Sequence, residues 1–539
     1  MSFCMVSYTQ VIVKRGPKPM AVLHIKRIRT LIMHIATDAQ FSFIKKLRRR
    51  YPQSQTYLVG GVVRDTLLGR QTKDFDFVVR GVSLRSIEKE LRTLGSVNAV
   101  GRRFGVLKFV PKCVQRTPSL EPFDIALPRT EHTGHFTGHY RDFVIKSDWR
   151  LPIEDDLSRR DFTINAMAID LANGTLIDPF GGMNDMPKKI IRCVGKPATR
   201  FAEDYSRMLR AIRFSCQLDF TLERETSQAI QAGMGKINKK IHPSKINSKK
   251  YDANTLRAVP YETIAKELSF ALSAYPRKAV QLFDCYGVFK ELMPPILAMK
   301  GCVQPALWHS EGDVWTHTEL CFKNIGSKRF KKEFGSHSVE PLLLWSLLFH
   351  DIGKPPALKT PEKDGVDRIR FDGHDRIGAD IAKRIAERLR LASVARMDIS
   401  SEDIWWLINY HLLVLNTDVA RIKHTTLEKY FFRDPRRGLL LRQLVFVDTL
   451  SSKRADGKSS LGSYRALTKR LQEYEQRFHR KATLPKPIIN GDEIMKALRL
   501  SPGPLVGKYI LLVREEQLAK RVCTKRQALA FLKKELQLQ

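Results

Sequence analysis

The chain has 539 residues, with 93 lysines and arginines against 56 aspartates and glutamates, so its formal net charge is +37. A chain this long predicts three or four domains. The positive charge is typical of a protein that binds a polyanion, although a generally basic, solubilising surface is the alternative. The eight cysteines form no CxxC pair, which argues against a disulfide framework or a zinc ribbon. No apolar run approaches the ~18 residues of a membrane span, so we expect a cytoplasmic protein without membrane contact.

In chain order, the sequence predicts a mixed domain followed by helices. The segment "QFSFIKKLRRRYP" predicts a helix that Pro52 ends. β-type runs such as "TYLVGGVV", "FDFVV" and "FDIAL" then alternate with helix-like runs, which predicts an α+β architecture, and the remainder reads as helical. The expected domains are a basic N-terminal extension (1–40), an α+β head (41–195), a helical neck (196–305) with a polar, basic insert (231–260), a second helical block (306–465) and a helical tail (466–539).

Two carboxylates, Asp74 and Asp76, interrupt the strand-like run "DFDFVV". Side chains two residues apart in a strand share a face, so we expect both aspartates on one face and Phe75 and Phe77 on the other. Neighbouring carboxylates repel unless a cation lies between them. Two Mg²⁺ ions at such a pair would drive phosphoryl or nucleotidyl transfer. The alternative is a solvated strand edge, and Asp124 in the later run "FDIAL" is a candidate third carboxylate.

Gly60, Gly61 and Arg64 precede this pair. The glycines allow the backbone to approach a triphosphate closely, and Arg64 can neutralise phosphate charge. The whole spacing, "GGVVRDTLLGRQTKDFD", resembles the head-domain signature of class II nucleotidyltransferases. This family holds tRNA CCA-adding enzymes and bacterial poly(A) polymerases, within the DNA polymerase beta superfamily. "RRDFTINA" is similar to a further motif of the family, and this resemblance implies that Arg160 and Asp161 help to hold ribose and phosphates.

A third segment, "FAEDYSRMLRAIRF", resembles the family's nucleotide-selecting motif, which implicates Glu203, Asp204, Arg207, Arg210 and Arg213. The last four fall at steps of three, a spacing that aligns side chains along one face of a helix. A carboxylate accepts from an exocyclic amine and an arginine donates to ring acceptors. Asp204 with Arg207 therefore suits cytosine and adenine but not uracil or guanine, while Arg210 and Arg213 are expected to meet the triphosphate. A solvated charged stripe is the alternative.

A second cluster of metal-binding residue types lies in the helical block. His350 and Asp351 follow an apolar run in "LLLWSLLFHDIGKP", and adjacent side chains can both point inward only where the helix ends. The order of histidines and aspartates resembles that of HD-domain metallophosphohydrolases. The residues are His317, His350, Asp351, His374, His411 and Asp448. Such ligands suit Mn²⁺, Ni²⁺, Fe or Mg²⁺. A helical body that has kept the fold and lost the metal is the alternative.

Together these features predict a template-independent RNA nucleotidyltransferase that adds CCA to tRNA 3′ ends from CTP and ATP. Its head would use Asp74 and Asp76 as Mg²⁺ ligands, its neck would select the base, and its basic body and tail would bind tRNA phosphates. The first alternative is a poly(A) polymerase, or a CC- or A-only adding enzyme, on the same scaffold. The second is an RNA-binding HD phosphohydrolase with a vestigial head, against which the intact Asp74, Asp76 and Arg160 argue.

Overall fold

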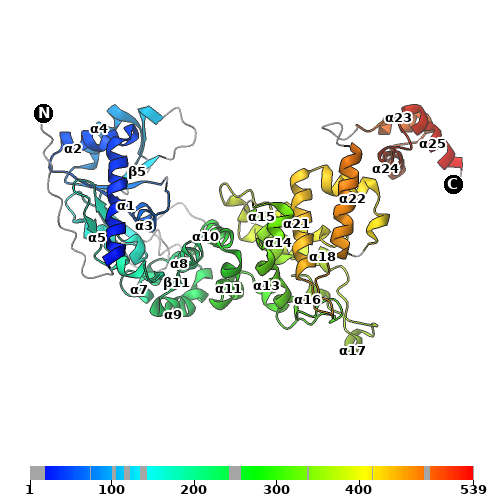
Figure 1. Cartoon of the computed structure of the whole chain (residues 1–539), viewed down its shortest axis with the longest axis horizontal. Helices are drawn as coiled ribbons and strands as arrows, with labels where there is room; N and C mark the ends of the chain where they lie inside the picture. The colour runs from blue at the N-terminus through cyan, green and yellow to red at the C-terminus, as the bar shows by residue number, and fades with distance from the viewer. Residues whose placement is uncertain are drawn as a thin grey trace. The chain divides into compact units, whose positions relative to one another are not determined.

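The structure is a computed structural model that describes most of the chain in nine stretches: 18–72, 74–99, 105–114, 122–133, 143–241, 257–336, 339–415, 417–478 and 486–537. The chain divides into two compact units, Met1–Leu292 and Met293–Gln539 (Figure 1). Residues 1–17 of the predicted extension and 242–256 of the predicted insert lie outside the described residues.

A seven-stranded mixed sheet lies at the centre of the first unit (Figure 1). Its strand order is β3-β4-β5-β2-β1-β8-β9. The strands are β1 (Gln55–Val59), β2 (Asp76–Arg80), β3 (Gly95–Asn98), β4 (Val106–Pro111), β5 (Phe123–Ala126), β8 (Ala168–Asp170) and β9 (Leu176–Ile177). Strand β2 pairs antiparallel with β1 and parallel with β5. Two short sheets pair β6 (Arg129–Thr133) with β7 (Phe143–Ser147), and β10 (Ile190–Ile191) with β11 (Thr221–Leu222).

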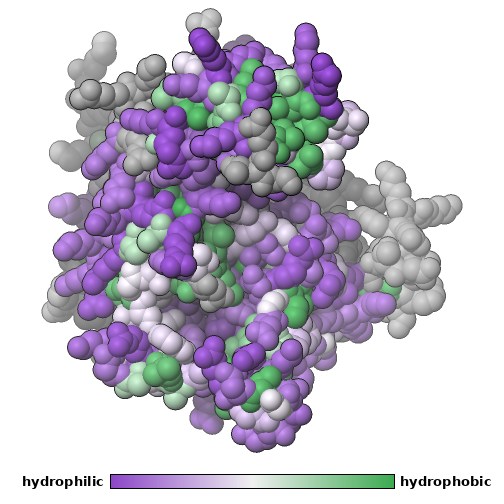
Figure 2. Space-filling view, turned by 90° about the vertical axis from the view of Figure 1, so that its right-hand side faces the viewer, coloured by the Kyte–Doolittle hydropathy of each residue, from purple (hydrophilic) through white to green (hydrophobic). Residues whose placement is uncertain are grey.

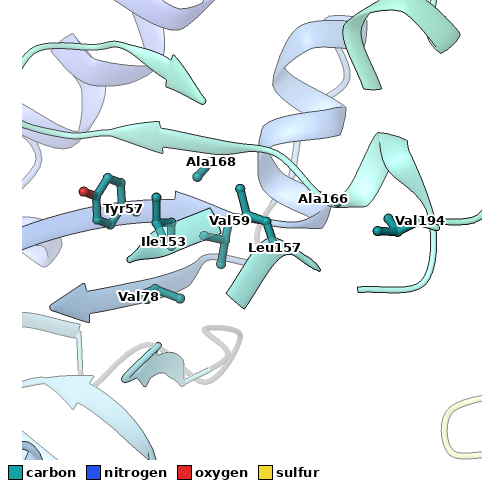
Figure 3. Close-up of a cluster of buried hydrophobic side chains, with 8 residues drawn as sticks. All are labelled: Tyr57, Val59, Val78, Ile153, Leu157, Ala166, Ala168 and Val194. Atoms are coloured by element: carbon teal, nitrogen blue, oxygen red, sulfur yellow. The ribbon is translucent and has the colours of Figure 1, made fainter. Parts of the chain in front are cut away.

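Strand β2 is buried on both faces of the sheet, because alternate side chains enter two different apolar clusters. Phe77 lies on one face, in an aromatic cluster with Phe41, Phe43, Phe75 and Phe123. On the other face, Val78 packs with side chains of β1 and of the helix α5 (Ile153–Ser158), as Figure 3 shows. Burial on both faces accounts for the continuous apolar run after Asp76 and fixes the register of the strand.

Helices pack against the sheet and continue beyond it to complete the first unit. In addition to α5 they are α1 (Lys18–Thr37), α2 (Ser42–Arg50), α3 (Gly61–Leu68), α4 (Leu84–Leu94), α6 (Gly182–Asp185), α7 (Pro197–Glu203), α8 (Ser206–Leu218), α9 (Arg224–Gly233), α10 (Tyr261–Ala274), α11 (Pro276–Cys285) and α12 (Val288–Leu292). The helix predicted before Pro52 is α2, whose Phe43, Ile44 and Leu47 are buried. Helix α8, which carries most of the nucleotide-selecting motif, packs along α10.

Helix α1 shows that part of the N-terminal extension packs on the sheet domain. Ile28 and Ile35 are buried. Arg27 donates from its guanidinium to the carbonyl of Leu67, in the last turn of α3, where helix carbonyls lack intrahelical partners. The chain from Lys18 onward therefore contributes packing and a helix cap to the first unit.

The described elements of the second unit are helices. The longer ones are α13 (Val314–Asn324), α14 (Lys328–Phe334), α15 (Pro341–Phe349), α18 (His374–Arg388), α19 (Ser401–Tyr410), α21 (Pro435–Ser451), α22 (Gly462–Phe478), α23 (Gly491–Leu498), α24 (Pro504–Leu518) and α25 (Lys525–Gln537), and the short ones are α16 (Lys354–Ala357), α17 (Pro361–Asp364) and α20 (His424–Leu427). Helix α15 is buried from Leu342 to Phe349, which explains why its sequence is apolar on every face.

The tail helices α23, α24 and α25 form a small core of their own, built around residues such as Ile494, Tyr509 and Leu532. The carboxylate of Glu515 on α24 accepts from the backbone N–H groups of His424 and Thr425 at 2.8 and 2.7 Å. These N–H groups begin α20 and lack intrahelical partners, so the tail is attached to the helical block by a helix cap.

Within the part of the chain that the structure describes, no helix is both long enough and apolar enough to cross a membrane. Hydrophilic side chains cover most of the face shown in Figure 2, with smaller apolar patches between them.

Candidate functional site

Three carboxylates meet where β2 and β5 begin. Asp76 is the first residue of β2, and the parallel pairing makes Asp124 of β5 its direct neighbour. Asp74 is exposed and lies two residues before the strand, whereas the sequence predicted both aspartates within it. The reason is that β1 ends at Val59 and the chain turns away at Gly60, so the segment before Asp76 lacks that neighbour.

The carboxylate edge, meaning Asp74, Asp76 and Asp124, concentrates negative charge. Burial, followed by the charge of Asp74 and then of Asp124, raises the pKa of Asp76 to about 6. Phe75 and Phe77 are both buried in the aromatic cluster, away from solvent, as the alternation predicted. Oxygen donors crowded in this way are what a hard divalent cation prefers, so the residues present fit a magnesium-type site.

Gly60 allows a cationic side chain to approach the carboxylate edge. Its φ of +75° is unfavourable for residues with a side chain, and a Cβ there would lie 2.7 Å from Nη1 of Arg160 and 3.8 Å from Oδ2 of Asp76. Arg160 is held in place by Asp156, whose Oδ2 accepts from Nη2 at 3.0 Å. Gly61 begins α3 directly after this turn. The predicted nucleotide-binding residues Gly60, Gly61 and Arg160 are thus brought together with Asp76.

Asp161 and Arg64 lie in a hydrogen-bonded chain that joins the head to α8. Arg64 Nη1 donates to Asn165 Oδ1 at 2.7 Å, and Asn165 Nδ2 donates to Asp161 Oδ1 at 3.1 Å. Asp161 Oδ2 accepts from Nε and Nη2 of Arg210 at 2.9 and 2.6 Å. Although burial opposes ionisation, the Arg210 charge holds the pKa of Asp161 at about 2. We call this series of four hydrogen-bonded side chains the head–neck link: Arg64, Asn165, Asp161 and Arg210.

The nucleotide-selecting motif spans two helices, not one. Asp204 is extended (φ −150°, ψ 105°) between α7 and α8. Contrary to the prediction, it therefore does not lie on the helix face that carries the arginines. Its carboxylate accepts from the backbone N–H of Ser206 at 2.8 Å, which turns the chain into α8. The predicted core positions of α8, including Met208 and Ile212, are buried.

The three arginines of α8 each face an acidic side chain. Arg207 Nη1 donates to Glu203 Oε2 at 2.6 Å, Arg210 binds Asp161, and Arg213 Nε donates to Glu267 Oε2 at 2.5 Å. The stripe is therefore built into the protein, whereas the sequence presented it as wholly available to a ligand. Arg210 is the most exposed of the three, with 36% of its side chain accessible to solvent, whereas Arg207 is buried.

Sequence reasoning missed several partners of these residues. Asn165 lies inside the recognised "RRDFTINA" motif, and Asp156 stands one helical turn before Arg160, so both carried a local signal. Glu267 is on α10, 54 residues after its partner Arg213, and no local pattern connects the two. Glu131, on β6, binds Arg159 at 2.9 Å and lies 3.9 Å from Arg207.

In the second unit, all six predicted HD residues converge. His317 lies on α13, His350 and Asp351 follow α15, His374 begins α18, His411 follows α19 and Asp448 lies on α21. Each is buried. Asp351 stands between two donor groups: its Oδ2 is 3.3 Å from His350 Nε2 and 3.9 Å from His317 Nε2, while its Oδ1 is 3.6 Å from His374 Nε2 and 3.9 Å from His411 Nε2.

The four imidazoles of this HD centre share one orientation. Nδ1 of His350, His374 and His411 donates to the backbone carbonyl three residues earlier, at 2.9, 2.8 and 2.6 Å. Nδ1 of His317 donates to the carboxylate of Glu311 at 2.8 Å. In the neutral ring this leaves the Nε2 lone pair directed at the centre, as metal-binding histidines require. Nε2 of His374 and His411 is buried without a hydrogen bond, so the donor set fits a cation.

The electrostatics of the HD centre differ on the two sides of Asp351. Burial opposes protonation, but the neighbouring Asp351 raises the pKa of His350 to about 9. Lys354, itself buried, places Nζ 2.8 Å from Asp351 Oδ2. Burial and the neighbouring His374 lower the pKa of His411 to about 4. The Oδ2 side of Asp351 therefore faces the cationic groups His350 and Lys354, whereas its Oδ1 side faces neutral imidazole.

Three residues of the HD centre were not predicted: Glu311, Lys354 and Cys321. Lys354 follows His350 and Asp351 by one turn in "HDIGK", and Cys321 follows His317 by four residues, so spacing offered a signal for both. Glu311 lies in an irregular segment before α13 and has no periodic signal. Its two oxygens accept from His309, His317 and the backbone of Lys453, which connects α13 to the end of α21.

Comparison with known proteins gives matches at both centres. Residues 56–192 match the poly(A) polymerase head domain and residues 326–445 match the HD domain. The multifunctional CCA protein of Neisseria gonorrhoeae (strain NCCP11945) is 32% identical over 401 residues, which span 73% of this chain and 83% of that protein. That of Xylella fastidiosa (strain M23) is 33% identical over 346 residues, 62% of this chain and 70% of that protein.

This chain belongs to the tRNA nucleotidyltransferase family. The family resemblance read from the sequence is thereby confirmed. The A-adding tRNA nucleotidyltransferase of Deinococcus radiodurans, another relative, is 29% identical over 488 residues, which cover 88% of this chain and 94% of that protein.

Solved structures confirm the fold of this tRNA nucleotidyltransferase. The CCA-adding enzyme of Bacillus stearothermophilus in complex with CTP has a TM-score of 0.56 at 18% identity, covering 97% of this chain and 98% of that one. The Thermotoga maritima CCA-adding enzyme complexed with tRNA has a TM-score of 0.52 at 21% identity, covering 98% of both. The predicted α+β head with a helical remainder is therefore correct.

The two domain matches cover only part of each centre in this nucleotidyltransferase. The head match contains the carboxylate edge, Arg160 and Asp161, but it ends before the nucleotide-selecting motif. The HD match contains His350, Asp351, His374 and His411, but it excludes His317 and Asp448. The structure brings the excluded residues to the matched ones, with His317 Nε2 3.4 Å from His350 Nε2 and 3.2 Å from Asp448 Oδ1.

Proposed function

We propose that this chain adds CCA to the 3′ end of tRNA from CTP and ATP, without a nucleic-acid template. The carboxylate edge beside Gly60 and Arg160 is the observation that carries the proposal, because it combines cation ligands with a phosphate-binding arginine. The relatives named for CCA addition and for A addition on tRNA support the same chemistry. The excess of 37 positive charges suits a partner that presents many phosphates.

In this proposal Asp74, Asp76 and Asp124 hold Mg²⁺, which supplies charge neutralisation for the reacting phosphate and hydroxyl when bound. Arg160 and Arg64 neutralise the remaining phosphate oxygens. The tRNA 3′-hydroxyl forms a new bond to the α-phosphorus, the bond to pyrophosphate breaks, and the hydroxyl proton passes to water. The chain's own contribution is to align nucleotide and primer at the edge of the sheet.

Base selection is assigned to Asp204 and Arg207, at the junction of α7 and α8. Burial raises the pKa of Asp204, and Ser206 and Arg207 act against that shift. Arg207 is held by Glu203, which orients its guanidinium. Arg210 and Arg213 pair with Asp161 and Glu267. We therefore propose that their first role is to hold the shape of the site, and that contact with the triphosphate is a second role. The proposed domains are the five segments expected from the sequence.

The test offers labelled tRNA ending at the discriminator base, tRNA ending in CC, and a generic RNA, each with one nucleotide at a time. CCA addition requires CMP incorporation on the first substrate and AMP on the second, with little on generic RNA. Incorporation of A alone, and only after CC, would replace the proposal by A addition, which the Deinococcus radiodurans relative makes a specific alternative. Long A tracts on generic RNA would indicate a poly(A) polymerase.

The HD centre supports a second function, metal-dependent phosphate-ester hydrolysis. The supporting observation is the set of four imidazoles with Nε2 directed at Asp351 and Asp448. Mn²⁺, Ni²⁺ or Mg²⁺ held there would supply an activated water, and Lys354 offers a cation for the phosphate. We expect His350→Ala to abolish phosphate release from RNA with a terminal phosphate or 2′,3′-cyclic phosphate, and to leave nucleotide addition unchanged. Hydrolysis that survives in this variant would place the activity elsewhere.

A further inference from the structure

Cys321 lies in the HD centre although the motif contains no cysteine. It follows His317 by four residues on α13 and so projects from the same helix face. Its Sγ is 3.5 Å from His317 Nε2, and the residue is completely buried. His317, Cys321 and His350 offer three ligand atoms that all lie within 4.8 Å of one another.

We propose that Cys321 is a thiolate ligand of the cation in the HD centre, together with His317, His350 and Asp448, and that it directs this centre towards Zn²⁺, Co²⁺, Ni²⁺ or Fe²⁺ and away from Mg²⁺. The inference rests on the proposed HD centre and adds to it the identity of the metal. Thiolate ligands favour softer cations, whereas Mg²⁺ takes oxygen ligands.

The separations between donor atoms carry the argument. Around His317 Nε2, Asp448 Oδ1 lies at 3.2 Å, His350 Nε2 at 3.4 Å and Cys321 Sγ at 3.5 Å. Ligands bound to one cation at 2.0–2.3 Å, with tetrahedral or octahedral angles, are themselves about 3 to 3.7 Å apart. The three donors around His317 Nε2 therefore lie at the distances that ligands of one cation keep from one another, and Cys321 and His350 are within 4.8 Å of each other as well.

The orientation of His317 supports the same reading. Glu311 is acceptor-only when ionised, so it accepts a hydrogen bond from the Nδ1–H of His317. The Nε2 lone pair of the neutral ring then faces Asp448, His350 and Cys321. An independent sign of a ligand is the other donor group, where Nε2 of His374 and His411 is buried without a hydrogen bond. Cation binding forms a metal–sulfur bond and breaks the S–H bond of Cys321. The proton passes to solvent, and nothing is oxidised or reduced.

The competing explanation is a hydrogen bond from the Cys321 thiol to His317 Nε2, with no role for sulfur in metal binding. The two explanations differ in the spectrum of the bound metal. We would load the metal-free, full-length protein with Co²⁺ and record its near-ultraviolet absorption. The expected result is a thiolate-to-cobalt charge-transfer band that Cys321→Ser abolishes and that Cys302→Ser, a buried cysteine of the same unit outside both donor groups, retains.

Two further measurements separate the possible failures. X-ray absorption of the wild-type protein with Co²⁺ should show a sulfur neighbour at about 2.3 Å, a test that needs no variant to fold. Cys321→Ser should weaken the binding of Zn²⁺ about tenfold or more, while the affinity for Mn²⁺ should change by less than about twofold. If Co²⁺ binding depends on His350 but shows no sulfur neighbour, the proposal of a Cys321 ligand is wrong and the metal site at the HD centre stands. If no Co²⁺ binding depends on His350, the proposal that the HD centre binds a metal is itself wrong.

Discussion

Asp76 is half-buried beside two further carboxylates, Asp74 and Asp124. It sits at the first position of a strand whose remaining residues are core, so its backbone is fixed by the pairing with β5 while its carboxylate faces Asp74 and Asp124. A rigid strand start is a more precise support for a cation than a loop.

We expect Asp76→Ala to lower nucleotide addition about a thousandfold or more, because the variant loses the best-fixed ligand of the reacting cation. tRNA binding should remain near wild type, since the phosphate-binding arginines are unchanged. Single-turnover addition with Mg²⁺ and a filter-binding assay measure the two effects. Asp148→Ala, an aspartate outside the carboxylate edge, serves as the matched control. Retention of more than a few per cent of the rate would remove Asp76 from the metal site.

Arg207→Ala should change which base is added, as well as the rate. Removal of one arm of the Asp204–Arg207 pair is expected to reduce the preference for CTP over UTP about tenfold or more, because a hydrogen bond to a base edge is worth about 1–3 kcal/mol. Kinetics with each of the four nucleotides measure the ratio. Arg200→Ala is a suitable control, because Arg200 binds the same Glu203 oxygen at 2.8 Å. An unchanged CTP/UTP ratio in Arg207→Ala would contradict base readout by this pair.

At the scale of elements, α8 is joined to two partners by ion pairs. Arg210 binds Asp161 of the head, and Arg213 binds Glu267 of α10. Removal of one partner from such a buried pair leaves an uncompensated charge, which costs more than the pair itself contributes. The helix thus carries the nucleotide-selecting motif at a defined position beside the sheet.

The head–neck link predicts a pH-dependent contribution to stability. The folded-state pKa of Asp161, about 2, lies below its ordinary value of 3.8, so the stabilisation is present above about pH 4 and is lost as the pH falls towards 2. Asp161→Asn should lower the free energy of unfolding by about 2 kcal/mol at neutral pH, and the difference should shrink in acid. Urea unfolding of both proteins at neutral and acidic pH measures it. Asp219→Asn, from an exposed pair with Lys278, should change stability by less than about 1 kcal/mol.

What the sequence could predict depended on the range of each interaction. The face alternation at Phe75 and Phe77 and the buried positions of α8 follow from local periodicity, and both agree with the structure. The partners of the arginines could not be read, because Asp161 and Glu267 stand 49 and 54 residues from them along the chain. The break at Asp204 was missed for another reason: a step of three looks the same whether or not one helix continues through it.

On the scale of the whole molecule, the positive charge predicts binding that weakens steeply with salt, because bound phosphates release counterions. The segment 242–256 contributes three lysines. Its flanking residues Lys240 and Arg257 pair as neighbouring backbones, so a short glycine linker can replace the segment. Deletion from residue 242 spares Ile237 and Asn238, which are built into the neck.

Deletion of 242–256 should reduce the slope of log K for tRNA against log salt by about 2 to 3, if each lysine neutralises one phosphate. Binding titrations at several salt concentrations give the slope. Replacement of Lys245, Lys249 and Lys250 by glutamine keeps the length and should produce the same change. A slope that stays constant in both variants would show that this segment does not contact RNA.

The six residues of the HD centre come from five separate places in the second unit: α13, the ends of α15 and α19, the start of α18, and α21. A cation bound there would connect these elements to one another. Because a ligand that binds only the folded state stabilises it, such a cation would raise the melting temperature of the protein. At a hundredfold excess over its dissociation constant, a cation would add about 2.7 kcal/mol. Thermal melting in the presence of different metals therefore ranks their affinity without knowledge of the substrate. We expect His411→Ala, which removes an imidazole whose buried Nε2 makes no hydrogen bond, to reduce the differences between the metals in that ranking.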